Sequence, residues 1–144
     1  MDPLNPNFRQ AVQRLFDEAE FIQRLGVELF DCGPGWCETR LAIRKDHFQQ
    51  DGVIHACVES TMADHTAGAA GTTLIAAGEI VLTAEYKINL LRATASTELR
   101  CRAKVIRAGH RLIVAESDVW NPADGPEQLV AKAIVTVAVL KKRP

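Results

Sequence analysis

Apolar residues recur every three or four positions near the start of the chain, and at every second position through most of its second half. The first pattern predicts a helix that begins at Asn5 or Asn7 and runs to about Arg24, because its apolar residues share one face. These residues are Phe8, Val12, Leu15, Phe16, Ala19 and Ile22. The second pattern predicts strands, because successive side chains of a strand point to opposite faces of a sheet.

Six segments have the alternation or the apolar composition of strands. They cover about residues 27–30, 36–43, 80–90, 98–105, 112–120 and 128–140. Turn residues separate several of them, as in Gly33-Pro34-Gly35 and Asn121-Pro122-Ala123-Asp124-Gly125. Within residues 80–90, the even-numbered side chains from Ile80 to Leu90 are expected to lie on one face and the odd-numbered ones on the other.

One long segment, about residues 55–75, interrupts the strands and is expected to be a helix. Antiparallel strands that alternate in this way have one apolar face, which another element must cover. The helix is the natural cover, so we expect an α+β fold in which an antiparallel sheet of about five to six strands wraps one long helix. We expect a single domain over residues 1–144, with an N-terminal helix over 1–24 and the core over 25–140.

Asp64 is the unusual residue of that central helix. At 100° per residue its neighbours on the helix surface are small, whereas larger apolar residues lie on the far side. The neighbours are Cys57, Ser60, Thr61, Ala67, Gly68 and Gly71, and the far side holds Val58, Met62 and Ala69. Small side chains let another backbone, a second subunit or a ligand approach closely. Asp64 is then either a structural acid or a reactive base or nucleophile.

The start of the same helix offers free backbone N–H groups, which can polarise a carbonyl or hold an oxyanion. Asp64 lies roughly 13 Å along the axis from that end. A site that uses both groups is therefore favoured if a second copy of the chain supplies one of them. Glu59 points about 140° away from Asp64 and is expected to face solvent or an interface. Cys57 is interpreted as a small buried cysteine in preference to a nucleophile.

Composition limits the choice of partners and compartment. The 144 residues have a formal net charge of -1, with 47% hydrophobic and 24% charged residues, so no strong field attracts nucleic acid or an anionic membrane. No apolar run has the length of a membrane span, and the acidic N-terminal segment lacks the apolar block of a secretory signal. The four cysteines lack metal-site spacing. We expect a cytoplasmic protein without a nucleic-acid or membrane partner.

Three segments resemble a known family. They are FIQRLGVELFDCGPGWCETRLAI, QQDGVIHACVESTMADHTAGAAG and LTAEYKINLLRAT. They resemble the hotdog-fold acyl-CoA thioesterases, specifically the phenylacetate-pathway (PaaI-type) branch, and the likeness covers about residues 21–140. The motif of that family is an Asn, a Gly three residues later, His-Gly-Gly, and an acid nine residues after the His. Here these positions are Gln49, Gly52, His55-Ala56-Cys57 and Asp64.

The resemblance implies hydrolysis of an acyl-CoA to a free acid and CoA, with no metal or redox cofactor and with coenzyme A only as part of the substrate. It assigns Asp64 of a facing subunit as general base or nucleophile, and the Ala56 N–H as the donor to the thioester carbonyl. It places Gln49 where an Asn helps to position water or substrate, and Thr83 where a Ser or Thr assists the acid. It gives His55 a structural role. It also implies a homodimer at least, and homotetramers are common in the family.

Arg92, Arg107 and Arg111 lie at the ends of predicted strands and are candidates to bind the phosphates of CoA, although solvation of the surface also explains them. The change from His-Gly-Gly to His-Ala-Cys keeps a backbone N–H but adds side chains, so activity could be shifted, slowed or lost. Two alternatives stay open. One is a non-catalytic protein that binds acyl-CoA or an acyl chain. The other is a hotdog dehydratase or hydratase, for which only His55 is available as the catalytic histidine.

Overall fold

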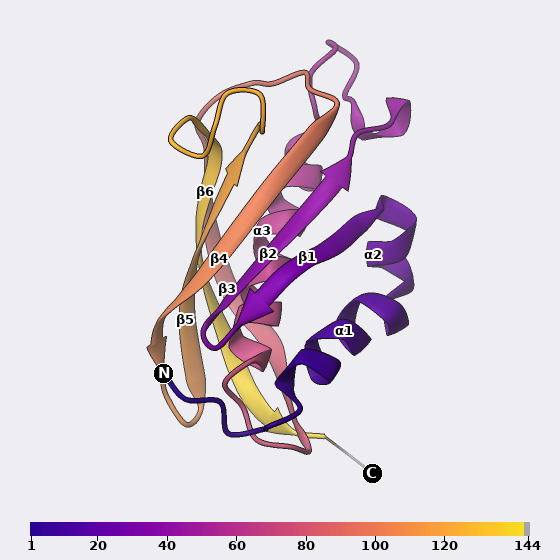
Figure 1. Ribbon diagram of the computed structural model, residues 1–144. Helices are drawn as coiled ribbons and strands as arrows, with labels where there is room; N and C mark the ends of the chain where they lie inside the picture. The colour runs from indigo at the N-terminus through magenta and orange to yellow at the C-terminus, as the bar shows by residue number, and fades with distance from the viewer. Residues whose placement is uncertain (143–144) are drawn as a thin grey trace.

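Six antiparallel strands form one sheet, and helix α3 (Ala56–Thr72) lies against one face of it (Figure 1). The strands are β1 (Val27–Gly33), β2 (Trp36–Ala42), β3 (Glu79–Leu90), β4 (Glu98–Ala108), β5 (Leu112–Trp120) and β6 (Leu129–Lys141). Their order across the sheet is β1-β2-β4-β5-β6-β3, so β1 and β3 are the edges. This computed structural model describes residues 1–142. The predicted α+β fold, a long helix wrapped by an antiparallel sheet, is confirmed.

The predicted N-terminal helix is interrupted and forms two helices, α1 (Phe8–Glu18) and α2 (Glu20–Leu25). Ala19 lies between them with an extended backbone (φ -91°, ψ 90°). The Gln23 side chain donates hydrogen bonds to the carbonyl oxygens of Phe16, at 3.2 Å, and of Asp17. These carbonyls belong to the last turn of α1, where intrahelical donors are missing. The break is therefore stabilised by a side chain of the next helix.

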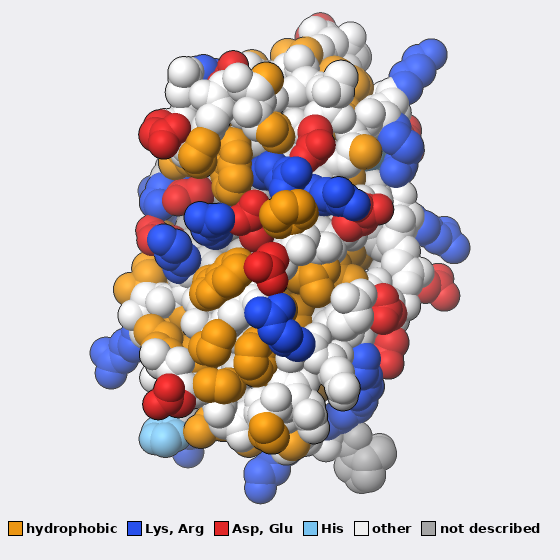
Figure 2. Space-filling view, viewed as in Figure 1, with side chains coloured by type: hydrophobic (Ala, Val, Ile, Leu, Met, Phe, Trp, Pro, Cys, Tyr) orange, Lys and Arg blue, Asp and Glu red, His pale blue; other side chains and the backbone are white. Residues whose placement is uncertain are grey.

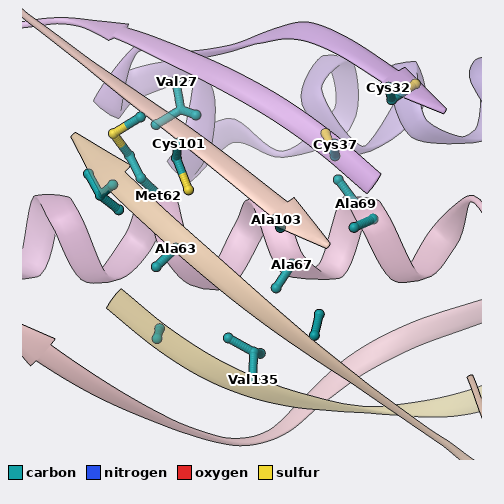
Figure 3. Close-up of a cluster of buried hydrophobic side chains, with 14 of the residues drawn as sticks. Val27, Cys32, Cys37, Met62, Ala63, Ala67, Ala69, Cys101, Ala103 and Val135 are labelled. Atoms are coloured by element: carbon teal, nitrogen blue, oxygen red, sulfur yellow. The ribbon is translucent and has the colours of Figure 1, made fainter. Parts of the chain in front are cut away.

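The hydrophobic core lies between α3 and the sheet (Figure 3). The predicted apolar side of α3 is buried, since Val58, Met62 and Ala69 are 6%, 0% and 0% exposed. Gly71 also belongs to this side, because a Cβ atom there would lie 3.3 Å from Val137 Cγ2 on β6. Gly71 and the buried Ala67 were predicted to share the Asp64 side. Gly71 instead lets the helix and β6 approach closely.

A bulge in β3 changes which of its side chains face α3. The pairing with β6 shifts by one residue between Thr83 and Glu85, so Ala84 is an extra residue. The predicted single face of even-numbered residues is therefore wrong for the first half of the strand. Ile80 and Leu82 point away from the helix, and Leu82 is 54% exposed. The side chains on the helix side are Val81, Thr83, Tyr86, Ile88 and Leu90.

The face of the sheet that points away from α3 carries acids and bases side by side (Figure 2). Arg102 Nε donates to Glu38 at 2.8 Å, and Lys132 donates to Glu116 and Asp118 at 2.9 and 2.7 Å. Both signs of charge are interleaved on this face, in keeping with the small net charge of the chain. Over residues 1–142, the helices are all too short or too polar to cross a membrane.

Candidate active site

At the start of helix α3, the Ala56 backbone N–H has no hydrogen-bond acceptor among residues 1–142. His55 is the N-cap residue, and its ring Nδ1 accepts a hydrogen bond from the Cys57 N–H at 3.0 Å. The His55 carbonyl oxygen accepts from the Val58 N–H at 2.9 Å. In the described part of the chain, no acceptor is found for the Ala56 N–H. Because a helix N-terminus carries positive partial charge, this N–H is available to an external oxygen.

The loop before α3 is held by its own hydrogen bonds. The Gln49 N–H donates to the Val53 carbonyl at 2.9 Å, and the His55 N–H donates to the His47 carbonyl at 2.9 Å. Gly52 has φ +81°, a left-handed conformation that favours glycine. The side-chain oxygen of Gln49 accepts from the Asp51 N–H, which leaves the amide nitrogen of Gln49 as a free donor.

A cavity of about 480 Å³ opens at this end of α3. Its walls come from the loop before the helix, from the first turn of the helix and from the segment that follows β3. The cavity brings together several residues that the sequence placed in the site. These are Gln49, His55, Ala56 and Arg92. We call it the N-terminal cavity of α3.

Glu59 also lines the N-terminal cavity, which corrects the part of the expectation that it faces solvent. The residue is only 4% exposed. It follows Ala56 by three positions, so the two side chains lie on adjacent turns of the same helix face. Burial raises the pKa of Glu59 to about 7. Helical angles measured from Asp64 could not place Glu59 at a cavity, because the segment that lines the cavity opposite the helix, Leu90 to Ala93, is distant in sequence.

Asp64 lies about two turns beyond Ala56 along α3, on the side of the helix that faces β3. The Thr83 Oγ1 donates a hydrogen bond to Asp64 Oδ1 at 2.7 Å, so the structure brings these two sequence-predicted residues into contact. Burial raises the pKa of Asp64, and the hydrogen bond from Thr83 opposes that change by stabilising the carboxylate. Thr83 thereby fixes the direction of the acid, and Oδ2 has no hydrogen-bond donor among the described residues.

Asp64 and Ala56 do not meet within one protomer. Eight residues separate them on one helix, about 12 Å along its axis, and Asp64 does not line the N-terminal cavity. A side of α3 that the protomer leaves partly uncovered runs between them. This side carries Cys57, Ser60, Thr61, Asp64 and Gly68, which are exposed or half-buried. The prediction that Cys57 is buried is wrong, because its side chain belongs to this uncovered side.

The three arginines predicted to bind phosphates do not gather in one protomer. Arg92 lines the N-terminal cavity, and its Nη1 donates to Gln128 Oε1 at 2.7 Å. Arg107 and Arg111 flank the turn between β4 and β5, at the opposite end of the sheet. The strands between these two ends make the separation roughly 25 Å. Only Arg92 is therefore next to the residues that form the candidate site.

The cysteines outside α3 belong to the core. Cys32 and Cys37 are partners across β1 and β2, and both thiols are free. Burial raises the pKa of the Cys37 thiol, and it raises that of Cys101 to about 12. A thiol that stays protonated is a poor nucleophile. Over the part of the chain that the structure describes, no three His, Cys, Asp or Glu side chains are arranged to bind a metal ion.

Residues 51–127, which are 77 of the 144 residues, match the thioesterase superfamily. The chain belongs to this superfamily. It is similar to a thioesterase family protein from Silicibacter pomeroyi, with 29% identity and a TM-score of 0.88, covering 93% of this chain and 98% of that one. The conserved protein PA5202 from Pseudomonas aeruginosa is 32% identical with a TM-score of 0.78, covering 85% of this chain and 94% of that one.

A protein of Saccharolobus solfataricus that is provisionally named an esterase is 29% identical over 135 residues, 93% of this chain and 94% of its own length. The part that matches the thioesterase superfamily contains most of the candidate site, including Ala56, Glu59, Asp64 and Thr83. Gln49 lies just before the matched residues. The superfamily match therefore spans both the start of α3 and the acid on its uncovered side.

Proposed function

We propose that this member of the thioesterase superfamily hydrolyses acyl-CoA thioesters as a PaaI-type hotdog thioesterase, in an assembly of at least two copies. The observation that carries the proposal is the free N–H of Ala56 at the start of α3, beside a cavity that can admit a ligand. A carboxylate, Asp64, is available on the uncovered side of the same helix. Thioester hydrolysis needs such a donor for the carbonyl oxygen and such a base for water.

In the proposed reaction the thioester carbonyl oxygen accepts a hydrogen bond from the Ala56 N–H. As the carbonyl carbon becomes tetrahedral, the positive end of α3 stabilises the charge that develops on this oxygen. Asp64 takes a proton from the attacking water, the C–S bond breaks, and the products are the free acid and the thiolate of CoA. Attack by Asp64 itself would give a mixed anhydride that water then hydrolyses, and it needs the same placement. Gln49 and Thr83 are positioning residues.

A second copy of the chain would bring the two groups together. β3 is an edge strand of 12 residues, so one side of its backbone has unpaired N–H and C=O groups. Antiparallel pairing of two β3 edges about a two-fold axis would bring the uncovered sides of both α3 helices together. Asp64 of each copy would then approach the start of α3 in the other copy. A homotetramer built from two such dimers would keep these sites.

The test is release of free thiol from a panel of aromatic, short, medium and long acyl-CoAs. Asp64→Asn keeps the shape of the side chain but removes the base, so we expect turnover to fall at least about a hundredfold. Asp124→Asn removes a carboxylate from an exposed turn and should keep wild-type turnover.

Unchanged turnover in Asp64→Asn would remove this residue from the mechanism. If the wild-type protein cleaved no thioester of the panel but bound acyl-CoA tightly in calorimetry, we would conclude that it is a non-catalytic acyl-CoA-binding protein and not a thioesterase. The Cβ atom of Ala56 and the exposed side chain of Cys57, next to the proposed oxyanion position, give that outcome a structural basis.

A further inference from the structure

The Glu59 carboxyl faces a cavity and has no hydrogen-bond partner among the described residues. Its residue is 4% exposed, and it lines the N-terminal cavity of α3. Among residues 1–142 no group donates a hydrogen bond to this carboxyl or forms an ion pair with it, and burial is the only cause of its raised pKa. Arg92 lines the same cavity, but its Nη1 donates a hydrogen bond to Gln128 and not to Glu59. A carboxyl that faces a cavity without a protein donor is available to accept a hydrogen bond from a ligand that carries one.

Two cavities of about 480 Å³ flank the uncovered side of α3, and their walls differ. The N-terminal cavity has polar side chains from Gln49, Gln50, Glu59 and Arg92. The second cavity lies between α1, the end of α3 and the start of β3. Its apolar walls include Leu15, Ile75, Ile80 and Val81, and the charged Arg14, Glu18, Glu79 and Lys142 line it as well. The N-terminal cavity suits the amide-rich, phosphate-ended arm of CoA, and the apolar part of the second cavity suits an acyl chain.

We propose that Glu59 contacts the substrate by accepting a hydrogen bond from the cysteamine amide N–H of the CoA arm. This inference rests on the proposed function and deepens it, because it assigns the thiol side of the substrate to the N-terminal cavity. Two methylene groups separate that amide nitrogen from the thioester sulfur. Ala56 and Glu59 are neighbours on adjacent turns, a spacing that matches the short span from a thioester oxygen to this amide.

The proposal makes a prediction about specificity. Glu59 would select thioesters of CoA and of other carriers that end in the same cysteamine amide, whatever the acyl group. Thioesters of simple thiols lack the amide donor and would leave the Glu59 carboxyl unpaired. An enzyme site built around a buried polar group discriminates against ligands that lack its partner.

The experiment compares two small thioesters that carry the same acyl group. One is the N-acetylcysteamine thioester, and the other has an ester oxygen in place of the amide N–H. We expect the wild-type protein to prefer the amide compound about tenfold in kcat/KM, which is the effect of one hydrogen bond. Glu59→Met keeps an unbranched side chain without a strong acceptor and should abolish this preference. Glu59→Gln keeps an acceptor oxygen and should retain most of it.

The proposal would be overturned if Glu59→Met lowered kcat/KM equally for both thioesters, so that the variant kept the wild-type preference for the amide compound. A second measurement, calorimetric titration with coenzyme A alone, tests the role of Glu59 separately from the proposed thioesterase activity, because binding needs no turnover. Glu59→Met should weaken binding of coenzyme A about tenfold, even if the wild-type protein cleaves no thioester. Equal affinity of the wild-type and Glu59→Met proteins, both with intact thermal unfolding transitions, would also contradict it.

Discussion

A backbone N–H does not depend on the side chain beside it, and this explains how Ala56 can occupy a position where the resembled family has glycine. Ala56 and Cys57 are the first helical residues of α3. Among the described residues, positive φ values occur only at glycines, so neither side chain strains the backbone. The Cβ atoms of Ala56 and Cys57 therefore demand no unusual backbone angle. What the two side chains change is the space next to the N–H.

The hydrogen bond from Thr83 stabilises the ionised form of Asp64, which makes a pH-dependent prediction. Thr83→Val removes the hydroxyl that donates to the Asp64 carboxylate and keeps nearly the same shape. Burial then acts on the carboxyl unopposed, so the pKa of Asp64 should rise further. Because only the ionised acid accepts a proton from water, the acid limb of the kcat/KM profile should move to higher pH, with the largest loss at low pH.

The matched control is Thr83→Ser, which keeps the hydroxyl and should keep the wild-type acid limb. Measuring thiol release across the pH range with both variants gives the comparison. An acid limb that stays in place in Thr83→Val would show that ionisation of Asp64 does not set it.

The two carboxyl groups on α3 show what a sequence can predict at the level of residues. Asp64 stood out because it interrupts a run of small residues, and it does lie on the uncovered side of the helix. Glu59 gave no such signal, since an acid in the first turn of a helix is ordinary. The cavity beside it is completed by the segment from Leu90 to Ala93, at the end of β3. Long-range placement of this kind cannot be inferred from helical angles.

At the level of elements, alternation predicted the strands, but it could not locate the bulge in β3. The extra residue is Ala84, which has no glycine or proline signal to mark it. One inserted residue reverses the face of the sheet to which each side chain beyond it points. As a result, Thr83 faces α3 in the first half of the strand, and Tyr86 and Leu90 face it in the second half. The contact between Thr83 and Asp64 depends on this exchange.

The spacing of α3 against β3 indicates how two edges would pair. Thr83 contacts Asp64, and Leu90 lines the cavity beside Ala56, so the strand runs antiparallel to the helix. Midway between Ala56 and Asp64 is Ser60, and the matching level on β3 is near Tyr86. A two-fold axis through this level would place each Asp64 near the other copy's Ala56.

That pairing predicts a charge contact between the two edges. With the two-fold axis at Tyr86, Glu85 of each copy lies opposite Lys87 of the other on the outer face of the sheet. Lys87→Glu would set acids opposite one another and should shift the assembly toward monomers in sedimentation velocity. The exchange Glu85→Lys with Lys87→Glu restores opposite charges and should restore the dimer. If the exchanged protein stayed as dissociated as the single variant, the register centred on Tyr86 would be wrong.

At the level of the whole molecule, the site is proposed to need two chains, and a mixing experiment can test this directly. Ala56→Pro removes the N–H of interest and should preserve the helix, because proline is well tolerated at the first position of a helix. His55 has φ -65° and ψ 134°, the extended conformation that a residue before proline prefers. Ala56→Pro and Asp64→Asn should each lose at least about a hundredfold in turnover as pure proteins.

Mixed dimers should regain activity if Asp64 acts across the interface. Each mixed dimer contains one intact site, made from Asp64 of the proline variant and the Ala56 N–H of the asparagine variant. Random exchange makes about half of the dimers mixed, so thiol release should recover to about a quarter of the wild-type rate. Two chains that each carry a complete site would regain nothing on mixing, because every site would keep one defect. The recovered rate therefore distinguishes a site shared between two protomers from one that lies within a single chain.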